Sequence, residues 1–597
     1  MKQTIDFKKW DLNSIFPGSG NSTELATLSE WIETELSLLE NQLAAVSKFT
    51  TIEETHKLSN LLEKVGELQK AVSQISSFAT CLLAENPSNQ HAKVLQGTST
   101  KLKARFSTVL QKFQKIVSEL DKEFLQSSAL KDYSFVLTQW QLEAALQLSD
   151  EEEELIAMLA VDGFHSWGQL YRSILEDIRV IVPINGKQRK CSFGQALGYR
   201  SHPNEEIRKK AFLALESELA KKEDLLAHIL NRIVGFRIQT DQKHGIQHPL
   251  SMPLKDNRMK AETLEAMWQA VLEHKQPFVD YLNYKAALLG KEKLLSHDFW
   301  APINDKNPSV GYQEGIDFML RQFAAFGPKL EVFARSAFAN NWVESAKRKN
   351  KSSIAFCAGF PLTGESRIFM TFDGSMTSLL TLTHELGHAF HNYAMNSVNG
   401  LNRNYPLSMA ESASTFAEMI VLNAAIENAA TTEEKLFLLD EKIKRSAMNF
   451  MNLHGRFLFE ERFYQKRKEG VLSAGELNTL MFDAMNEAHQ GAMDSISSRS
   501  WMSTPHFYIT SSPFYNFPYT FGYLFSVSLY VKALDEGKNF EPKYLALLRD
   551  SGSMAIEDLA MKHLGEDITE KTFWKKGMDH CAKDVEEFIR LSFIKKS

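Results

Sequence analysis

The sequence is organised around the stretch Thr383-His384-Glu385-Leu386-Gly387-His388-Ala389-Phe390-His391. This stretch contains the pattern His-Glu-x-x-His, which on a helix places two imidazoles one turn apart with a carboxylate after the first. Such a residue set suits a zinc ion that activates water. The sequence therefore predicts a metal centre that is carried by a helix.

The motif also divides its helix into two faces. A helix turns about 100° per residue, so the three histidines of the motif fall within one narrow arc. The opposite arc is apolar and consists of Leu379, Leu382, Leu386, Phe390 and Tyr393. One face can hold an ion while the other anchors the helix in a core. We therefore predict that His384 and His388 bind one zinc ion per chain.

A catalytic zinc site needs a third protein ligand and one position for water. Three histidines on consecutive turns do not easily reach one tetrahedral ion, so His391 is expected to support the site or the fold. The better candidate is Glu411, which shares a predicted helical face with Ser414 and Glu418. On a helix that crosses the motif helix, Glu411 could bind zinc while the other two orient ligands. The alternative interpretation of this face is an exposed acidic surface.

Glu385 lies off the histidine arc, so we expect it to act on water rather than on the metal. A carboxylate in this position can accept a proton from water and later deliver it to the leaving amine. Hydrolysis also builds an oxyanion, which needs hydrogen-bond donors beyond the metal. Candidate donors gather in one aromatic segment and are His506, Tyr508, Tyr515, Tyr519 and Tyr523.

Composition places the chain in an ordinary class. Its 597 residues are 44% hydrophobic and 24% charged, as in globular proteins, and the net charge of -6 gives no reason to expect a nucleic-acid partner. The N-terminal residues lack the apolar core of a signal peptide, and no apolar run reaches the roughly 18 residues that span a bilayer. The four cysteines are widely spaced, which suits a reducing compartment. We therefore expect a cytoplasmic protein without a membrane partner.

Apolar periodicity predicts a mainly α fold. Long amphipathic helices are expected over residues 25–148, with a break at Asn86-Pro87-Ser88-Asn89 and a capping box from Ser149 to Glu152. The Asn185-Gly186 pair predicts a β-hairpin over residues 179–193. We place a boundary there, between an N-terminal helical lobe of residues 1–195 and a catalytic domain of residues 196–597.

A second β region is expected just before the motif helix. Residues 353–357 and 367–372 are rich in aromatic and β-branched side chains and flank Pro361 and Gly364. A strand edge beside a metal site could bind an extended peptide, and a purely structural hairpin is the alternative. After the motif, helices are expected over residues 409–429, 432–468 and 473–493.

With these residues the chain resembles the M3 family of zinc metallopeptidases, in particular its oligoendopeptidase F branch. The resemblance covers most of the chain. It rests on Thr383 to His391, Glu411-x-x-Ser414-x-Phe416-x-Glu418, His506, Pro513-Phe514-Tyr515-x-x-Pro518-Tyr519-x-x-Gly522-Tyr523, Phe356-Cys357, and Trp10-Asp11-Leu12 with Phe16-Pro17.

The resemblance implies a two-lobed, almost all-helical molecule with zinc in a deep central channel and a small β-sheet near the active site. It implies His384, His388 and Glu411 as zinc ligands and Glu385 as general base and acid. It further implies His506 and one or two tyrosines as stabilisers of the tetrahedral intermediate, with Tyr515 and Tyr523 ranked above Tyr519.

The function implied is that of a zinc oligoendopeptidase acting on short, unstructured peptides. The alternative is a non-catalytic helical protein that binds peptides and holds a structural zinc. Such a zinc would need a fourth protein ligand, for which His391 is the nearby candidate. The sequence leaves open the cleavage preference and whether the protein is a monomer or a homodimer.

Overall fold

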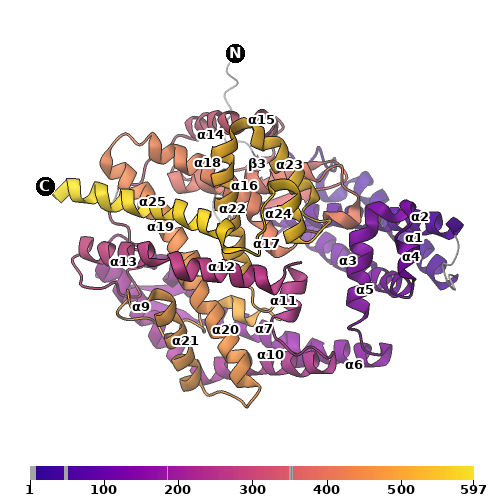
Figure 1. Ribbon diagram of the computed structural model, residues 1–597, viewed down its shortest axis with the longest axis horizontal. Coiled ribbons are helices and arrows are strands. Elements are labelled where there is room, and N and C mark those ends of the chain that lie inside the picture. The colour runs from indigo at the N-terminus through magenta and orange to yellow at the C-terminus, as the bar shows by residue number, and fades with distance from the viewer. Residues whose placement is uncertain are drawn as a thin grey trace. The chain divides into compact units, whose positions relative to one another are not determined.

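The computed structural model describes residues 9–45, 52–184, 186–304, 306–348, 351 and 354–596. Figure 1 shows the chain as a ribbon. The chain forms two compact units, each built from three segments. Unit 1 consists of Met1–Gln147, Pro308–Ala424 and Lys532–Glu566, and unit 2 consists of Leu148–Asn307, Ala425–Val531 and Asp567–Ser597. The positions of the two units relative to one another are not determined.

The mainly α class with small β-sheets is confirmed. The two units alternate along the chain, so they divide it differently from the predicted lobes of residues 1–195 and 196–597. That lobe assignment stays a prediction.

Unit 1 contains the motif helix and a three-stranded sheet. Its helices are α1 (Thr23–Ala45), α2 (Ile52–Glu85), α3 (Gln90–Ser118), α4 (Lys122–Leu125), α5 (Ser134–Ala144), α14 (Tyr312–Phe326), α15 (Pro328–Ala339), α16 (Met376–Ala394), α17 (Leu407–Ala410), α23 (Phe540–Asp550) and α24 (Ile556–Leu564). The strands are β3 (Val343–Glu344), β4 (Phe356–Phe360) and β5 (Glu365–Phe369). Helix α18 (Ser412–Glu427) begins in unit 1 and ends in unit 2.

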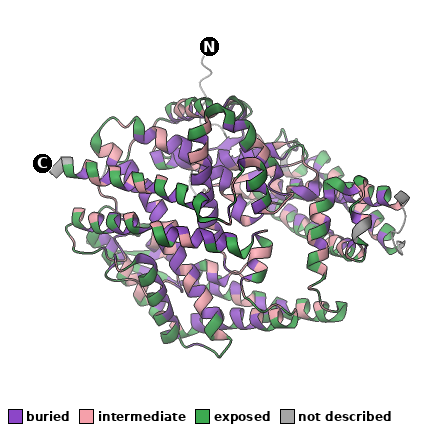
Figure 2. Ribbon diagram, viewed as in Figure 1, coloured by how far each residue is buried: buried purple, intermediate pink, exposed green. Residues whose placement is uncertain are grey.

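The N-terminal helices of unit 1 share a core with the sheet. Leu62, Phe78 and Phe113 are fully buried in it, and the Trp10 ring lies 5.5 Å from the ring of Phe369 on β5. Figure 2 shows many helices with buried residues on one side and exposed residues on the other. Burial of this apolar area, at about 25 cal/mol per Å², is the main force that holds the N-terminal helices to the segment carrying the motif.

The sheet has the order β3-β5-β4, so β4 is an edge strand. Strand β4 pairs antiparallel with β5, with Phe356 opposite Phe369, and β3 pairs parallel with β5. Gly364 closes the hairpin with a φ of 71°, a conformation that glycine adopts without strain. Both predicted strands form, but their bounds differ from the predicted 353–357 and 367–372. Strand β4 begins at Phe356 and ends three residues later than predicted, and β5 lies at Glu365–Phe369. Ser353 lies outside the described residues.

Unit 2 contains a second group of helices and one hairpin. Its helices are α6 (Asp150–Ala160), α7 (Ser166–Asp177), α8 (Phe193–Gly198), α9 (Glu205–Ala220), α10 (Glu223–Lys243), α11 (Ser251–Asp256), α12 (Ala261–His274), α13 (Gln276–Leu288), α19 (Thr432–Ala447), α20 (Leu453–Arg467), α21 (Ala474–His489) and α25 (Lys571–Lys596). The hairpin consists of β1 (Arg179–Ile184) and β2 (Lys187–Ser192). Helix α22 (Phe517–Glu536) begins in unit 2 and ends in unit 1.

Short helices connect these elements. They are η1 (Ser19–Asn21), η2 (Ser128–Tyr133), η4 (Tyr199–Ser201), η5 (Gly400–Arg403), η7 (Pro505–Tyr508) and η8 (Gly537–Asn539), with π-helical turns η3 (Val161–His165) and η6 (Met448–Asn452).

Local signals in the sequence were reliable. The break at Asn86 separates α2 from α3, and the Asn89 side chain accepts a hydrogen bond from the Ala92 amide at the start of α3. Ser149 and Glu152 form the predicted capping box of α6. The predicted hairpin forms with Arg179 opposite Ser192; Asn185 itself lies outside the described residues. The predicted helix over residues 432–468 is interrupted by a π-helical turn, η6.

Candidate metal centre

Helix α16 carries the motif and is anchored by its apolar face. Ser375 caps the helix, since its side chain accepts a hydrogen bond from the Ser378 amide. Leu379, Leu382 and Leu386 are fully buried, whereas Tyr393, at the end of the same predicted face, is 42% exposed. The apolar face fixes the helix in unit 1 and leaves the histidine arc free for chemistry.

Three side chains converge beside α16. His384 Nε2 lies 3.1 Å from His388 Nε2 and 3.2 Å from Glu411 Oε2. His388 Nε2 lies 3.7 Å from the same carboxylate oxygen. Glu411 stands at the junction of α17 and α18 rather than inside one continuous helix, where its carboxylate meets the motif helix from the side.

The spacing of these three atoms fits a tetrahedral metal ion. With zinc bonds of about 2.0–2.1 Å, tetrahedral ligand atoms lie about 3.4 Å apart, close to the three distances here. Two imidazole nitrogens and one carboxylate oxygen are also the donor set that catalytic zinc uses. The residues present therefore fit a zinc ion with one position left for a non-protein ligand.

Hydrogen bonds set the protonation of the three residues. Glu418 Oε1 lies 2.6 Å from His384 Nδ1, so that nitrogen carries the proton and Nε2 keeps its lone pair. The Ala410 carbonyl accepts a hydrogen bond from His388, whose pKa is lowered to about 4 by burial. Ser414 Oγ donates to Glu411 Oε2 at 3.1 Å. At neutral pH His388 is therefore neutral, which is the form that binds a metal.

The pKa values of Glu385 and Glu411 are shifted in opposite directions. Burial raises the pKa of Glu385 to about 7, and the charge of Glu411 adds to this effect. Burial alone would also raise the pKa of Glu411, but the facing imidazoles of His384 and His388 and the Ser414 hydroxyl favour its anion and lower the pKa to about 2. Glu411 is thus a permanent anion, whereas Glu385 can exchange a proton near neutral pH.

His391 does not join this group. Its ring stacks on Tyr405 with centroids 4.1 Å apart, and its Nε2 lies 2.9 Å from Ser551 Oγ. The side chain is fully buried, and burial lowers its pKa to about 3. His391 therefore packs between α16 and the end of α23, in a supporting position.

The aromatic donor segment belongs to unit 2. The His506 ring lies 5.1 Å from the Tyr515 ring and 5.6 Å from the Tyr519 ring, measured between centroids. Asn516 Oδ1 lies 2.8 Å from His506 Nδ1. Burial lowers the pKa of His506, so the neutral ring is favoured. Among the described residues, Tyr515 makes no hydrogen bond through its hydroxyl, which leaves this group free to donate.

The other tyrosines of the segment have different surroundings. The Tyr523 hydroxyl lies 2.8 Å from Ser446 Oγ inside unit 2, and the residue is 8% exposed. Tyr508 stacks on Tyr171 with centroids 3.6 Å apart. The assignment of Tyr523 as an oxyanion donor stays a prediction, and its hydroxyl would have to leave Ser446 to serve in that way.

A second group of metal-type ligands has another explanation. Glu205, His297 and Asp298 in unit 2 lie within reach of one another. Their carboxylates are already neutralised by cations, because Arg208 Nη2 lies 2.8 Å from Asp298 Oδ1 and Lys291 Nζ lies 2.6 Å from Glu205 Oε1. This group is an ion-pair network rather than a metal centre.

Two supporting residues carried no signal in the sequence. Asn516 orients His506, and Glu460 accepts a hydrogen bond from the Phe514 amide at 2.8 Å. Phe514 has a φ of 53°, a conformation that is rare for a phenylalanine and cannot be inferred from its side chain. Only the spatial arrangement shows that these residues hold the aromatic segment.

Comparisons with known proteins show the family of this chain. The family model described as Peptidase family M3 matches residues 199–580, more than half of the chain, and the model described as Oligopeptidase F matches residues 113–179. The chain belongs to peptidase family M3. It is therefore a peptidase, and the metallopeptidase class of this family is consistent with the three converging side chains.

Relatives of this M3 peptidase cover from about three quarters to nearly all of its length. It is 22% identical to the oligoendopeptidase F homolog of Lactococcus lactis subsp. lactis, over 94% of this chain and 93% of that protein. It is 24% identical to oligopeptidase PepF of Bacillus subtilis, over 76% of this chain and 68% of that protein.

Solved structures share the fold. Oligoendopeptidase-F from Enterococcus faecium superposes with a TM-score of 0.69 at 18% identity, covering 96% of this chain and 99% of that one. PZ peptidase A with an inhibitor superposes with a TM-score of 0.72 at 15% identity, covering 94% of this chain and 97% of that one. Among the described helices, none combines the length and the apolar character needed to cross a membrane.

Proposed function

We propose that this M3 peptidase is a zinc-dependent oligoendopeptidase that hydrolyses internal bonds of short, unstructured peptides. One observation carries the proposal: two imidazole nitrogens and one carboxylate oxygen converge within 3.1–3.7 Å, and the residue after His384 is a buried glutamate. We assign His384, His388 and Glu411 as ligands of one zinc ion per chain. When bound, zinc supplies a Lewis acid that polarises the peptide carbonyl and acidifies water.

Glu385 would move the proton. Its pKa of about 7, raised by burial, suits a group that accepts a proton from the attacking water and delivers it to the leaving nitrogen. The positive charge of a bound zinc ion would lower the pKa of this carboxyl and favour its ionised form, which is the form that accepts a proton. Glu418 would hold the His384 ring in its metal-binding tautomer through the 2.6 Å contact.

The aromatic segment would stabilise the oxyanion. We propose that the Tyr515 hydroxyl donates a hydrogen bond to it and that the neighbouring His506 does so in its protonated form, in which Nδ1 donates to Asn516 and Nε2 to the oxyanion. A negative charge beside the imidazole favours this protonated form. Tyr523 remains a candidate for this role from the family resemblance alone. The division into a lobe of residues 1–195 and a catalytic domain of residues 196–597 belongs to the same proposal.

The substrate class follows from the family. The Lactococcus and Bacillus relatives are named for oligopeptide cleavage, and we extend this to the present chain. We propose a cytoplasmic location, oligopeptides as the partners, and neither nucleic acid nor a membrane as a ligand. The proposed chemistry needs the residues of one chain and is the same for a monomer and a homodimer.

Replacing Glu385 by Gln tests the mechanism. The amide keeps the size of the side chain but cannot accept the proton, so kcat/KM for an internally quenched peptide should fall by about 10²–10⁴. Zinc content, measured by atomic absorption, should stay at one ion per chain. Glu314→Gln, which changes an exposed carboxylate on α14, is the matched control and should keep full activity.

Two results would contradict the proposal. Retained cleavage by zinc-loaded Glu385→Gln protein would remove Glu385 from the mechanism. Tight peptide binding by wild-type zinc-loaded protein, with no cleavage products detected by mass spectrometry, would instead support the non-catalytic alternative.

A further inference from the structure

Unit 2 contains a cavity of about 200 Å³ whose lining includes none of the residues assigned above. It is lined by α8, α9, α20 and α21, by the segment around Trp300, and by residues 493–504. Clefts for drug-sized ligands measure about 300–1,000 Å³, so this cavity suits a group about as large as one amino-acid residue. Its walls contain apolar side chains, among them Phe212 and Met485. They also contain three arginines, Arg200, Arg208 and Arg456.

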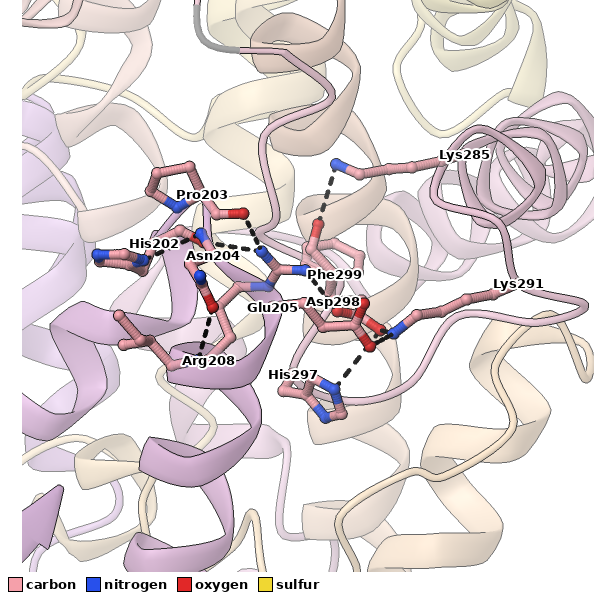
Figure 3. Close-up of polar contacts among 11 residues, drawn as sticks. His202, Pro203, Asn204, Glu205, Arg208, Lys285, Lys291, His297, Asp298 and Phe299 are labelled. Atoms are coloured by element: carbon pink, nitrogen blue, oxygen red, sulfur yellow. Dashed lines mark hydrogen bonds and ion pairs between the residues drawn. The ribbon is translucent and has the colours of Figure 1, made fainter. Parts of the chain in front are cut away.

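One wall of the cavity is fixed by the ion-pair network of Figure 3. Arg208 is 2% exposed, and its two terminal nitrogens are held by the His202 and Pro203 carbonyls and by Asp298. Asp298 also accepts from Lys291. Among the described residues, neither Arg208 Nε nor His297 Nε2 has a hydrogen-bond partner, and both side chains line the cavity.

Two further arginines line the cavity, and neither has an acidic partner among the described residues. Arg456 is half-buried on α20, and Arg200 is an exposed residue of η4 whose guanidinium lies 5.0 Å from the Trp300 ring centroid. Burial and the charge of Arg200 lower the pKa of Arg456 to about 10. Within the described part of the chain, neither forms an ion pair. Two like charges at one cavity are costly unless an anion lies between them.

The acidic side chain that lines the cavity already has partners. Glu216 accepts a hydrogen bond from Ser497 Oγ at 2.7 Å and lies 4.0 Å from Arg499 Nη1. It therefore does not supply the missing anion for Arg200 and Arg456. A carboxylate of a bound molecule would do so, and guanidinium groups bind carboxylates through paired hydrogen bonds.

The cavity also offers an acceptor. His489 is fully buried, and its Nδ1 lies 2.8 Å from the Met485 carbonyl, so Nδ1 carries the proton. Its Nε2 then presents a lone pair, and no described residue donates to it. A complementary ligand therefore needs an N–H or O–H group in addition to a carboxylate.

We propose that this cavity binds the C-terminal residue of a peptide that ends in an apolar side chain. Arg200 and Arg456 would bind the carboxylate, His489 Nε2 would accept from the N–H of the same residue, and Phe212 would contact the side chain. The inference rests on the proposed peptidase function in assigning the ligand to a peptide. An N-acyl amino acid presents the same three groups.

The position of the cavity suits such a role. Thr504 lines it and stands two residues before His506, and the positive charge of Arg456 contributes to the lowered pKa of His506. A carboxylate bound at Arg456 would therefore lie near the proposed oxyanion donors of the same unit. Peptide ends bound there would be recognised by charge and by one side chain, independently of the metal.

Calorimetry on full-length, zinc-loaded protein tests the site. N-acetyl-leucine should bind, and N-acetyl-leucinamide, which lacks the carboxylate, should bind at least tenfold more weakly. Arg456→Gln should weaken binding of N-acetyl-leucine at least tenfold. Arg462→Gln is the matched control, because Arg462 lies on the same helix, pairs with Glu487 and does not line the cavity.

A second variant keeps the test decisive if Arg456→Gln does not fold. Ala211 lines the cavity and is 2% exposed, so Ala211→Leu fills the space without removing a charge and should also abolish binding. Absence of binding by wild-type protein, equal binding of the acid and the amide, or binding that survives both variants would overturn the proposal.

The source of the ligand is decided by a third titration. N-acetyl-Ala-Ala-Leu should bind at least as tightly as N-acetyl-leucine if the cavity receives a peptide end; exclusion of the tripeptide would assign the site to a free amino acid and overturn the peptide assignment. Binding is independent of turnover. An inactive enzyme that binds these carboxylates would contradict only the proposed function, whereas an active enzyme that does not would contradict only this inference.

Discussion

At the scale of single residues, one hydrogen bond determines which ring nitrogen of His384 carries the proton. An isolated imidazole can carry its proton on either nitrogen. The 2.6 Å contact with Glu418 assigns the proton to Nδ1 and turns the lone pair of Nε2 toward His388 and Glu411. We therefore propose that Glu418 acts on the candidate metal centre through His384, as a positioning residue.

Replacing Glu418 by Gln should therefore weaken zinc binding without removing a ligand. We expect the zinc affinity to fall about 10–100-fold, because the tautomer and ring orientation of His384 are no longer enforced. Competition with a fluorescent chelator measures the change. Glu427→Gln on the same helix, at an exposed position, should leave the affinity unchanged. Equal affinities for the two variants would show that Glu418 does not orient His384.

Glu460 is a second residue whose surroundings decide its behaviour. It is 5% exposed and holds the Phe514 amide next to Tyr515. Burial raises its pKa to about 7, although the Phe514 amide and the charge of Arg237 oppose this effect. The folded protein therefore binds a proton at this position more strongly than the unfolded chain does.

This difference predicts a pH-dependent stability. Between pH 4.5 and 7 the folded state retains the proton that the unfolded state loses, so the stability contributed by Glu460 is present below pH 4.5 and is lost as pH rises. The loss is at most about 3 kcal/mol. Glu460→Gln keeps the acceptor oxygen, so the variant should match wild type at pH 4.5 and melt at a higher temperature at pH 8. A difference between the two proteins that is independent of pH would contradict this.

At the scale of elements, the crossing of α16 and α18 depends on one glycine. A Cβ on Gly387 would lie 2.5 Å from Ser414 Cα and 2.6 Å from the Ala413 carbonyl oxygen. These are backbone atoms and cannot give way as a flexible side chain does. The missing side chain lets α18 approach the motif helix closely enough for Glu411 to reach the histidines.

Gly387→Ala should therefore force the two helices apart. We expect a loss of about 1–3 kcal/mol of stability from overpacking, together with weaker zinc binding. Gly97→Ala on α3 is the matched control, because no atom lies within 4 Å of the position that its new methyl group would take, and alanine favours a helix by about 0.4–1 kcal/mol. Urea denaturation and zinc titration of both variants measure the effects. An unchanged zinc affinity for Gly387→Ala would show that the close approach is not needed.

At the scale of the whole molecule, the site depends on distant parts of the chain. His384 and Glu411 belong to the middle segment of unit 1, which packs on the N-terminal helices through Phe360, Phe369 and Leu401. His506 and Tyr515 belong to unit 2. The proposed ligands and the proposed oxyanion donors are therefore held by separate cores.

Metal removal should destabilise unit 1 in particular. Zinc at 100 times its dissociation constant stabilises a folded state by about 2.7 kcal/mol, provided that the unfolded chain does not bind it. A chelator should therefore lower the melting temperature of wild-type protein. Glu411→Gln, which loses one proposed ligand, should show a smaller change. Hydrogen exchange would place the loss at α16 and α18; equal effects of the chelator on both proteins would contradict Glu411 as a ligand.

Local chemistry is what the sequence determined by itself. The breaks, caps and hairpin between Asn86 and Ser192, the helical motif, and the apolar face of α16 follow from residue spacing, because each depends on neighbours within a few positions. The candidate ligands His384, His388 and Glu411 also follow from spacing and family resemblance.

Only the tertiary structure decided which of these residues meet. It brought Glu411 from a helix junction to the histidines, turned His391 toward Ser551, and paired the Tyr523 hydroxyl with Ser446. It also gathered Arg200, Arg456 and His489 around one cavity, although the first lies far from the other two in the sequence. Such contacts depend on how helices pack across long stretches of chain, and periodicity along the sequence does not encode that packing.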